Sequence, residues 1–304
     1  MNLAIIGGSE ACSLQPTGVG YYIRHLLWAL VDLELPTGVR LFFYLPPGEV
    51  LAQPLPEPRS RTAVFYIHRP KWIPRRLHDC WSSIRSYYDR IDAGYSTAFY
   101  HLFPRFFRGK KIATVFDVIF KDYPEFYSTE TAASLNRLVG AALDQADAAA
   151  VCSLATAEAV ERTYSCKKPL FALDGAARPQ FQPTAQATPE ETPFFLCVGR
   201  LDKRKNILNA VLAYRQLISA GHTCRLILAG PPDSGSEELQ EVLAQAIPGE
   251  DIVVTGYLEE NKLLPLSWVP RLSVPLPRRG TGPANPGGNG LRGTDRRSRP
   301  CTRP

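Results

Sequence analysis

The sequence lacks any run of 18 uncharged apolar residues, so it predicts no helix that spans a membrane. Its first residues, MNLAIIGG, are too short and lack the basic flank of a signal peptide, and they predict a first β-strand instead. The seven cysteines are odd in number and form no CxxC pair, which argues against a disulfide framework and against a zinc site. We therefore expect a protein of the reducing cytoplasm.

Positive and negative charges nearly cancel over most of the chain, and the excess positive charge lies at its C-terminal end. The formal net charge is +6, but residues 265–304 hold eight arginines and one aspartate, which leaves the first 264 residues at −1. Basicity confined to one end is weak evidence for nucleic-acid binding, and we expect no nucleic-acid partner. A length of 304 residues with 45% hydrophobic residues is enough for roughly two domains with apolar cores.

Residues 194–206, reading FFLCVGRLDKRKN, combine a buried strand with a cluster of cations. Five apolar residues run into Gly199, and a helix with an apolar face is expected over residues 206–220. Between them lie four cations, namely Arg200, Lys203, Arg204 and Lys205. Parallel sheets bind ligands beyond their strand ends, and cations beside helix N–H groups favour an anion such as phosphate. A solvated basic loop is the alternative on the pattern alone.

Glycines also follow the first expected strand, residues 3–6. A polar loop leads to Gly18 and Gly20, and an amphipathic helix is expected over residues 21–33. The two glycines allow either a close approach of the backbone to a ligand or a tight turn, and the pattern favours neither. The glycines are not spaced as GxGxxG, and no acidic residue follows at the required distance, which argues against an NAD-dependent oxidoreductase.

Strands and helices alternate along the rest of the chain. Strands are expected at residues 39–45, 64–67, 112–116, 148–152, 170–173, 194–199, 225–230 and 252–256. Helices are expected at residues 72–92, 128–146, 153–164, 206–220 and 237–247. The alternation predicts an α/β protein with parallel sheets. Residues 182–193 are polar and rich in Pro and Thr, and they predict a linker between two domains.

Two further stretches carry candidate functions. Asp117 follows an expected strand end and is a pocket candidate, although a turn or cap aspartate is commoner. The expected helix 72–92 is rich in aromatic and basic residues. Such a helix, or the stretch 103–111, can contact an anionic membrane. Core aromatics with solvated arginines are the commoner interpretation of helix 72–92.

Taken together, these segments resemble the glycosyltransferases of family four, which have the GT-B fold. The resemblance covers about residues 2–264 and depends on the order of seven segments: TGVGYYIRHLLWAL, ATVFDVIFKDYPEFY, ADAAAVCSLATAEAV, LDGAARPQF, FFLCVGRLDKRKNI, LILAG and IVVTGYL. It implies two Rossmann-like domains that face each other across a cleft. Residues 1–181 would form the acceptor-side domain and residues 194–264 the donor-binding domain.

The resemblance implies transfer of a sugar, with retention of configuration, from a nucleotide-diphosphate sugar to a polysaccharide, glycan or lipid-linked acceptor. It implies no metal and no cofactor. Arg200 and Lys205 match the residues that bind the donor diphosphate, and Gly18 and Gly20 match the glycine loop near the donor. Fixed cations stabilise the negative charge that builds on the leaving diphosphate. A peripheral position at the inner face of the membrane is a further hypothesis.

Two departures from the family pattern affect the expected site. The family often has a histidine before the aspartate of its TVHD-like segment, and here that position is Phe116. Asp117 therefore stands without it, and His101, nearby in sequence, is a second catalytic candidate. The family's pair of glutamates after an EGFG-like segment has no counterpart, so we hold an inactive remnant or a nucleotide-binding partner protein as the alternative function.

Residues 265–304 differ in composition from the rest of the chain. Proline and glycine make up 14 of these 40 residues, and no hydrophobic period continues beyond Val274. The composition predicts disorder. Either the tail is a genuine basic tail or a reading frame has shifted near codon 265, and the break inside a family helix favours the shift. We therefore expect an incomplete C-terminal domain with an uncovered sheet edge.

Overall fold

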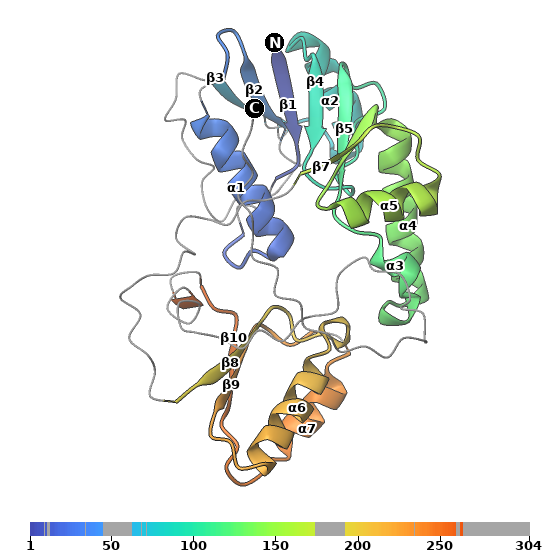
Figure 1. Ribbon diagram of the computed structural model, residues 1–304. Helices are drawn as coiled ribbons and strands as arrows, with labels where there is room; N and C mark the ends of the chain where they lie inside the picture. The colour runs from blue at the N-terminus through green and yellow to red at the C-terminus, as the bar shows by residue number, and fades with distance from the viewer. Residues whose placement is uncertain are drawn as a thin grey trace, which may run out of the picture.

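The computed structural model describes residues 1–8, 10, 13–33, 35–44, 63–67, 69–70, 72–173, 192–233, 235–259 and 262–263. Figure 1 shows two β-sheets in this part of the chain, each with its own helices. The predicted tail over residues 265–304 and most of the predicted linker lie outside the described residues. The domain boundaries predicted at 1–181 and 194–264 stay predictions.

The N-terminal half is built on a parallel sheet of seven strands in the order β3-β2-β1-β4-β5-β6-β7. The strands are β1 Asn2–Ile6, β2 Arg40–Tyr44, β3 Ala63–Ile67, β4 Ala93–Ser96, β5 Lys110–Val115, β6 Ala148–Val151 and β7 Leu170–Ala172. The strand order reverses between β1 and β4. Ligands of open parallel sheets bind at such a switch point, beyond the carboxyl ends of the strands.

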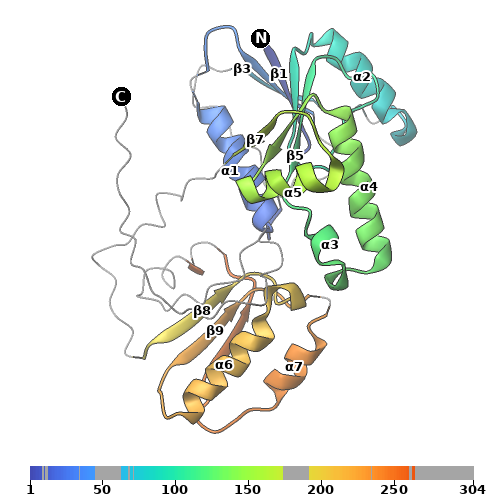
Figure 2. The ribbon, with the colours of Figure 1, turned by 45° about the vertical axis from the view of Figure 1, so that its right-hand side comes forward.

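Helices cover both faces of this sheet (Figures 1 and 2). They are α1 Gly18–Asp32, α2 His78–Tyr88, α3 Ile119–Asp122, α4 Thr129–Gln145 and α5 Leu154–Tyr164, with short 3₁₀ turns at η2 Arg75–Leu77 and η3 Pro124–Phe126. Alternate residues of β1 pack on opposite faces, because Ile5 contacts the α1 cluster and Ala4 contacts the cluster that includes Trp81 of α2. The sheet is thus buried on both sides, as a parallel sheet requires.

The C-terminal half has a parallel sheet of three strands in the order β10-β9-β8. The strands are β8 Phe194–Val198, β9 Arg225–Ala229 and β10 Ile252–Gly256, and the helical segments are η5 Lys203–Lys205, α6 Ile207–Ser219 and α7 Glu237–Ala244. Val211 of α6 and Leu239 of α7 belong to one core cluster with Leu228 of β9, so both helices cover the same face. Within the described residues β10 pairs on one side only, and its Val253 and Val254 are exposed.

The α/β class with two Rossmann-like sheets is confirmed, whereas one strand was missed and two local predictions are wrong. Strand β4 was not predicted. Helix α1 begins at Gly18 rather than at residue 21, so Gly18 and Gly20 lie in its first turn. The predicted helix 72–92 is shorter, and its aromatic residues other than Trp81 do not join the core, because Trp72, Tyr87 and Tyr88 are exposed.

Candidate functional site

In the first turn of α1, Gly18 has free space around it and Gly20 is closely packed. Thr17 caps the helix, because its Oγ1 accepts a hydrogen bond from the backbone N–H of Gly20 over 3.3 Å. A Cβ added to Gly20 would lie 2.9 Å from the carbonyl oxygen of Glu10, whereas one added to Gly18 would meet nothing within 4 Å. Gly20 therefore admits the loop that carries Glu10, and Gly18 leaves the N–H end of the helix accessible to an anion.

Glu10 and His101 form a hydrogen-bonded pair at the carboxyl end of β1. The Nε2 atom of His101 lies 2.7 Å from Oε1 of Glu10, and the two side chains are 14% and 26% exposed. The ring of His101 lies over Gly7, where an added Cβ would clash with it. The main chain at His101 is fixed as well, since its carbonyl oxygen accepts a hydrogen bond of 2.7 Å from Ser96 Oγ.

The carboxyl group of Glu10 is ionised in this pair. Burial would raise the pKa of Glu10, but the hydrogen bond and the charge of His101 outweigh burial and lower that pKa below its usual value. Glu10 is therefore ionised at neutral pH and holds the imidazole in place. Glu10 was not predicted as a site residue, because an isolated acidic residue in a polar loop forms no periodic pattern.

A cavity of about 170 Å³ adjoins this pair. It lies between the end of β1, the first turns of α2 and the loop after β4, and His101, His78 and Asp79 contribute to its lining. Burial lowers the pKa of His78, so its ring is neutral at pH 7. The cavity suits a small polar group such as the hydroxyls of a sugar or a polyol, because imidazole nitrogens and a carboxylate hydrogen-bond hydroxyls.

Asp117 follows β5 and makes a local contact. Its Oδ1 accepts a hydrogen bond from the backbone N–H of Ile119 over 3.3 Å, as a turn aspartate does. The preceding Phe116 packs edge-on against the ring of Tyr22, with 5.4 Å between the ring centroids. Asp117 and His101 follow neighbouring strands, but no hydrogen bond joins them among the described residues. A catalytic role for either stays a prediction.

In the C-terminal half, two loops run side by side at the carboxyl ends of β8 and β9. The N–H of Gly199 donates to Ala229 O over 2.9 Å, and the N–H of Leu201 donates to Pro231 O over 2.9 Å. Gly199 has a φ of +136°, which favours glycine. A side chain on Gly230 would clash with Gly199 O. The two glycines allow the loops to touch.

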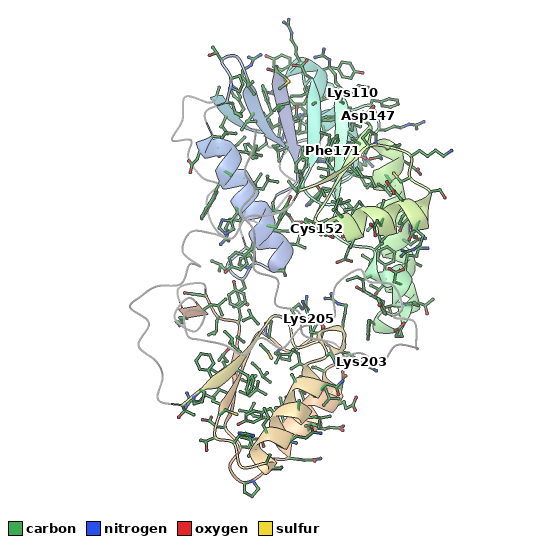
Figure 3. All side chains as sticks on the ribbon, viewed as in Figure 1. Lys110, Asp147, Cys152, Phe171, Lys203 and Lys205 are labelled. Carbon is green, nitrogen blue, oxygen red and sulfur yellow. The ribbon has the colours of Figure 1, made fainter. Side chains whose placement is uncertain are left out.

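The predicted cations Arg200 and Lys205 both lie on the first of these loops. The Nε atom of Arg200 is 2.7 Å from Oδ2 of Asp233 on the second loop, and the arginine side chain is 52% exposed. Lys205 folds back toward Gly199, since its Cε is 3.8 Å from where a glycine Cβ would stand. Figure 3 labels Lys205 on the side of the three-stranded sheet that faces the N-terminal half.

Asp202 and Asp233 are the carboxylates that balance this basic loop, and sequence reasoning missed both. Oδ1 of Asp202 accepts the backbone N–H of Lys205 over 2.8 Å, and Oδ2 lies 3.2 Å from Nη2 of Arg204. Asp202 thereby caps η5 and fixes the loop. A second cavity, of about 200 Å³, lies beside Asp202 and Ser236, but neither Arg200 nor Lys205 lines it.

The two halves of the predicted site approach each other through two tyrosines. The hydroxyl of Tyr21, in the first turn of α1, is 3.2 Å from the hydroxyl of Tyr257, which follows β10. Burial is the main cause that raises the pKa of Tyr257, so the phenol is neutral at pH 7. The carboxyl ends of β8, β9 and β10 share one edge, so this contact sets the turn of Gly18 and Gly20 opposite the edge that carries Arg200. Figure 1 shows this end of α1 pointing toward the three-stranded sheet.

No three His, Cys, Asp or Glu side chains of the described residues come together as metal ligands. Of the helices described, none is both long and apolar enough to cross a bilayer.

Comparison with known proteins identifies a family model and solved structures that this chain resembles. Residues 180–266 match the family model described as glycosyl transferases group 1. No curated protein sequence matches the chain. Among solved structures, sucrose-phosphate synthase from Thermosynechococcus elongatus is 18% identical with a TM-score of 0.63, and the alignment covers 88% of this chain and 74% of that one.

A second solved structure has the same fold. HepE from Anabaena, in complex with UDP and glucose, is 15% identical with a TM-score of 0.53, and the alignment covers 88% of this chain and 72% of that one. Membership of family four in particular stays a prediction. The chain has the GT-B fold, and its residues 180–266 resemble the glycosyl transferases of group 1.

Proposed function

We propose that this protein transfers a sugar, with retention of configuration, from a nucleotide-diphosphate sugar to a glycan or lipid-linked acceptor in the synthesis of a surface polysaccharide or glycolipid. One observation carries the proposal: the first turn of α1 lies opposite the strand edge that bears Arg200 and Lys205, joined by the contact of Tyr21 with Tyr257. We propose a cytoplasmic location, because the five cysteines in the described residues are free thiols.

The donor diphosphate binds between the two loops in this proposal. Arginine offers a planar fork of donors and lysine a point charge, which together suit a diphosphate. UDP in the complex of HepE supports a nucleoside diphosphate as the ligand. Arg200 must leave Asp233 to bind it, and the cost is small, because an exposed ion pair contributes about 0.2–1 kcal/mol.

The acceptor binds on the N-terminal side in this proposal. His101, held by the carboxylate of Glu10, lines the cavity at the end of β1 and hydrogen-bonds a hydroxyl group there. Asp117 is the second candidate, but its carboxylate already accepts the N–H of Ile119. No metal or cofactor enters the proposed reaction.

A nucleotide-binding protein without turnover is the second candidate function. Phe116 favours it, since it stands where the family often has a histidine and a phenyl ring cannot hydrogen-bond the sugar.

Nucleotide binding and donor hydrolysis together test both candidates. We expect UDP, GDP or ADP to bind in calorimetry, and Arg200→Ala and Lys205→Ala each to weaken binding about tenfold, or ~1.4 kcal/mol, because each removes a charge-assisted contact to the diphosphate. Arg225→Ala is the matched control, because its Nε pairs with Asp251 at 2.8 Å at the opposite end of the same sheet.

The outcomes separate the candidates. Release of sugar from the matching nucleotide sugar supports the transferase, and nucleotide binding without any release supports the binding protein. Absence of binding for all three nucleotides would contradict both.

A further inference from the structure

Helix α2 has its polar and apolar faces reversed. Its buried residues are Ser82, Ser83 and Ser86, whereas Ile84, Tyr87 and Tyr88 are 71%, 60% and 76% exposed. A surface helix normally buries its apolar face. The reversal leaves an apolar face in solvent with no role in the core of the described residues.

The serine face is fully suited to its buried position. Ser86 Oγ donates to Ser83 O over 2.6 Å and accepts the backbone N–H of Arg108 over 3.0 Å. Ser82 Oγ lies 3.4 Å from Nε2 of His78. Small side chains with satisfied hydroxyls let the helix pack closely on the sheet without losing hydrogen bonds. The exposed apolar face is therefore not a sign of a misplaced helix.

The exposed apolar face begins at Leu77, just before α2, and continues along the helix. Leu77 and Ile84 are one heptad apart and Tyr88 is four residues further, so they lie along one side of the helix. Tyr87 is three residues after Ile84 and is also exposed. We call the set the α2 outer surface: Leu77, Ile84, Tyr87 and Tyr88. Exposed apolar side chains that share one side of a helix mark an interaction site.

Exposed arginines flank α2. Arg76 lies just before the helix and Arg90 just after it, against one exposed acid on the helix, Asp79. Arg85 lies over the ring of Tyr88 at 4.9 Å. Aromatic and aliphatic side chains with a border of arginines suit the headgroup region of an anionic bilayer, where rings sit at the interface and cations meet lipid phosphates.

The position of α2 relates this surface to the cavity beside His101. His78, Asp79 and Ser82 of α2 line that cavity, so the helix has the cavity at its N-terminal end and the outer surface on its other side. We infer that the α2 outer surface docks on an anionic lipid surface. The cavity would then lie beside the headgroups and receive the polar head of a lipid-linked acceptor, a consequence that depends on the proposed function.

Vesicle binding tests the docking directly. We expect the full chain to sediment with vesicles of phosphatidylcholine and phosphatidylglycerol, and to do so less at high salt, because screening weakens the attraction to the lipid phosphates. Ile84→Asp should weaken binding at least about tenfold, since it replaces an inserted apolar side chain by an anion. Leu154→Asp is the matched control, because Leu154 on α5 is also 71% exposed.

Three results would overturn the inference. They are no binding to anionic vesicles, equal binding to pure phosphatidylcholine, or an equal loss in the Leu154→Asp control. A dimer in analytical ultracentrifugation that Ile84→Asp disrupts would assign the surface to a second copy of the chain instead. UDP affinity should stay unchanged in Ile84→Asp, so a failure of docking is distinct from a failure of the proposed function.

Discussion

At the residue scale, Gly7 and Gly38 offer a matched pair of glycines that separates backbone strain from a contact in the site. Both have a φ of +88°, but an added Cβ at Gly38 meets nothing within 4 Å, whereas at Gly7 it clashes with His101. We expect Gly38→Ala to lower the free energy of unfolding by about 1–2 kcal/mol through the left-handed backbone alone. Gly7→Ala should lower it further in urea unfolding, because His101 must also move. Equal losses would show that the ring position imposes no constraint.

The pairing of Glu10 with His101 predicts an acid-sensitive contribution to stability. The pKa of Glu10 is lowered in the folded protein from an ordinary value of 4.5, so its contribution is complete above pH 4.5 and is lost as the pH falls through the folded pKa. The free energy of unfolding should therefore decline less steeply below pH 4.5 in Glu10→Gln than in the unaltered protein. Urea unfolding at a series of pH values measures this.

The control for this pH series is Glu158→Gln, an exposed glutamate on α5. Its curve should run parallel to that of the unaltered protein. If the Glu10→Gln curve is parallel too, then the carboxylate of Glu10 gains nothing from His101 in the folded state.

The cations of the candidate site could be predicted from the sequence more readily than the carboxylates that pair with them. Arg200 and Lys205 stand out because four cations follow a buried strand, and the structure puts both on the loop after β8. The carboxylate of Asp233 was missed, because it reaches Arg200 from a separate loop. Glu10 likewise meets His101 across 91 positions of sequence. Such pairs depend on tertiary packing, which leaves no local pattern.

At the scale of the element, the two helices that follow a serine were predicted to within one residue of their start. Ser128 and Ser153 each accept the backbone N–H three residues on, and α4 and α5 begin immediately after them. The start of α1 was predicted three residues late, because Gly18 and Gly20 have low helix propensity. Its cap, Thr17, provides the same hydrogen bond as the serines.

Strand β4 and helix α2 show how packing overrides periodicity. Strand β4 reads AGYS and carries no apolar run, because the rings of Phe103 and Phe107 cover Gly94 in place of a side chain of its own. In α2 the apolar residues were taken for the core face, but serines fill that role. Neither element carries the apolar pattern on which such a prediction depends, because Gly94 is covered by neighbouring rings and α2 buries its own small serines.

At the scale of the whole molecule, the alternation of strands and helices predicted two parallel sheets but not how they meet. The contact of Tyr21 with Tyr257 joins residues 236 positions apart, and no pattern in either segment points to it. That contact brings the glycines of α1 to the edge with the cations. The family resemblance implied that two domains face each other across a cleft, but the contact that joins them came from the structure alone.

The two sheets also predict unequal local stability. Strand β5 lies inside the seven-stranded sheet with partners on both sides, whereas β10 is the edge of a three-stranded sheet and exposes Val253 and Val254. Few buried contacts mean that local opening costs less free energy. We expect amides of residues 252–256 to exchange with deuterium at least about tenfold faster than those of residues 110–115 in mass spectrometry of the full chain.

Strand β9 is the internal control for this measurement, because it has a strand on each side within the same small sheet. Amides of residues 225–229 should be better protected than those of β10. Exchange of β10 as slow as that of β5 would contradict the prediction, since it would require a cover over Val253 and Val254. Equally fast exchange of β9 and β10 would instead mean that the small sheet opens as one unit, so that the exposed edge is not what limits its stability.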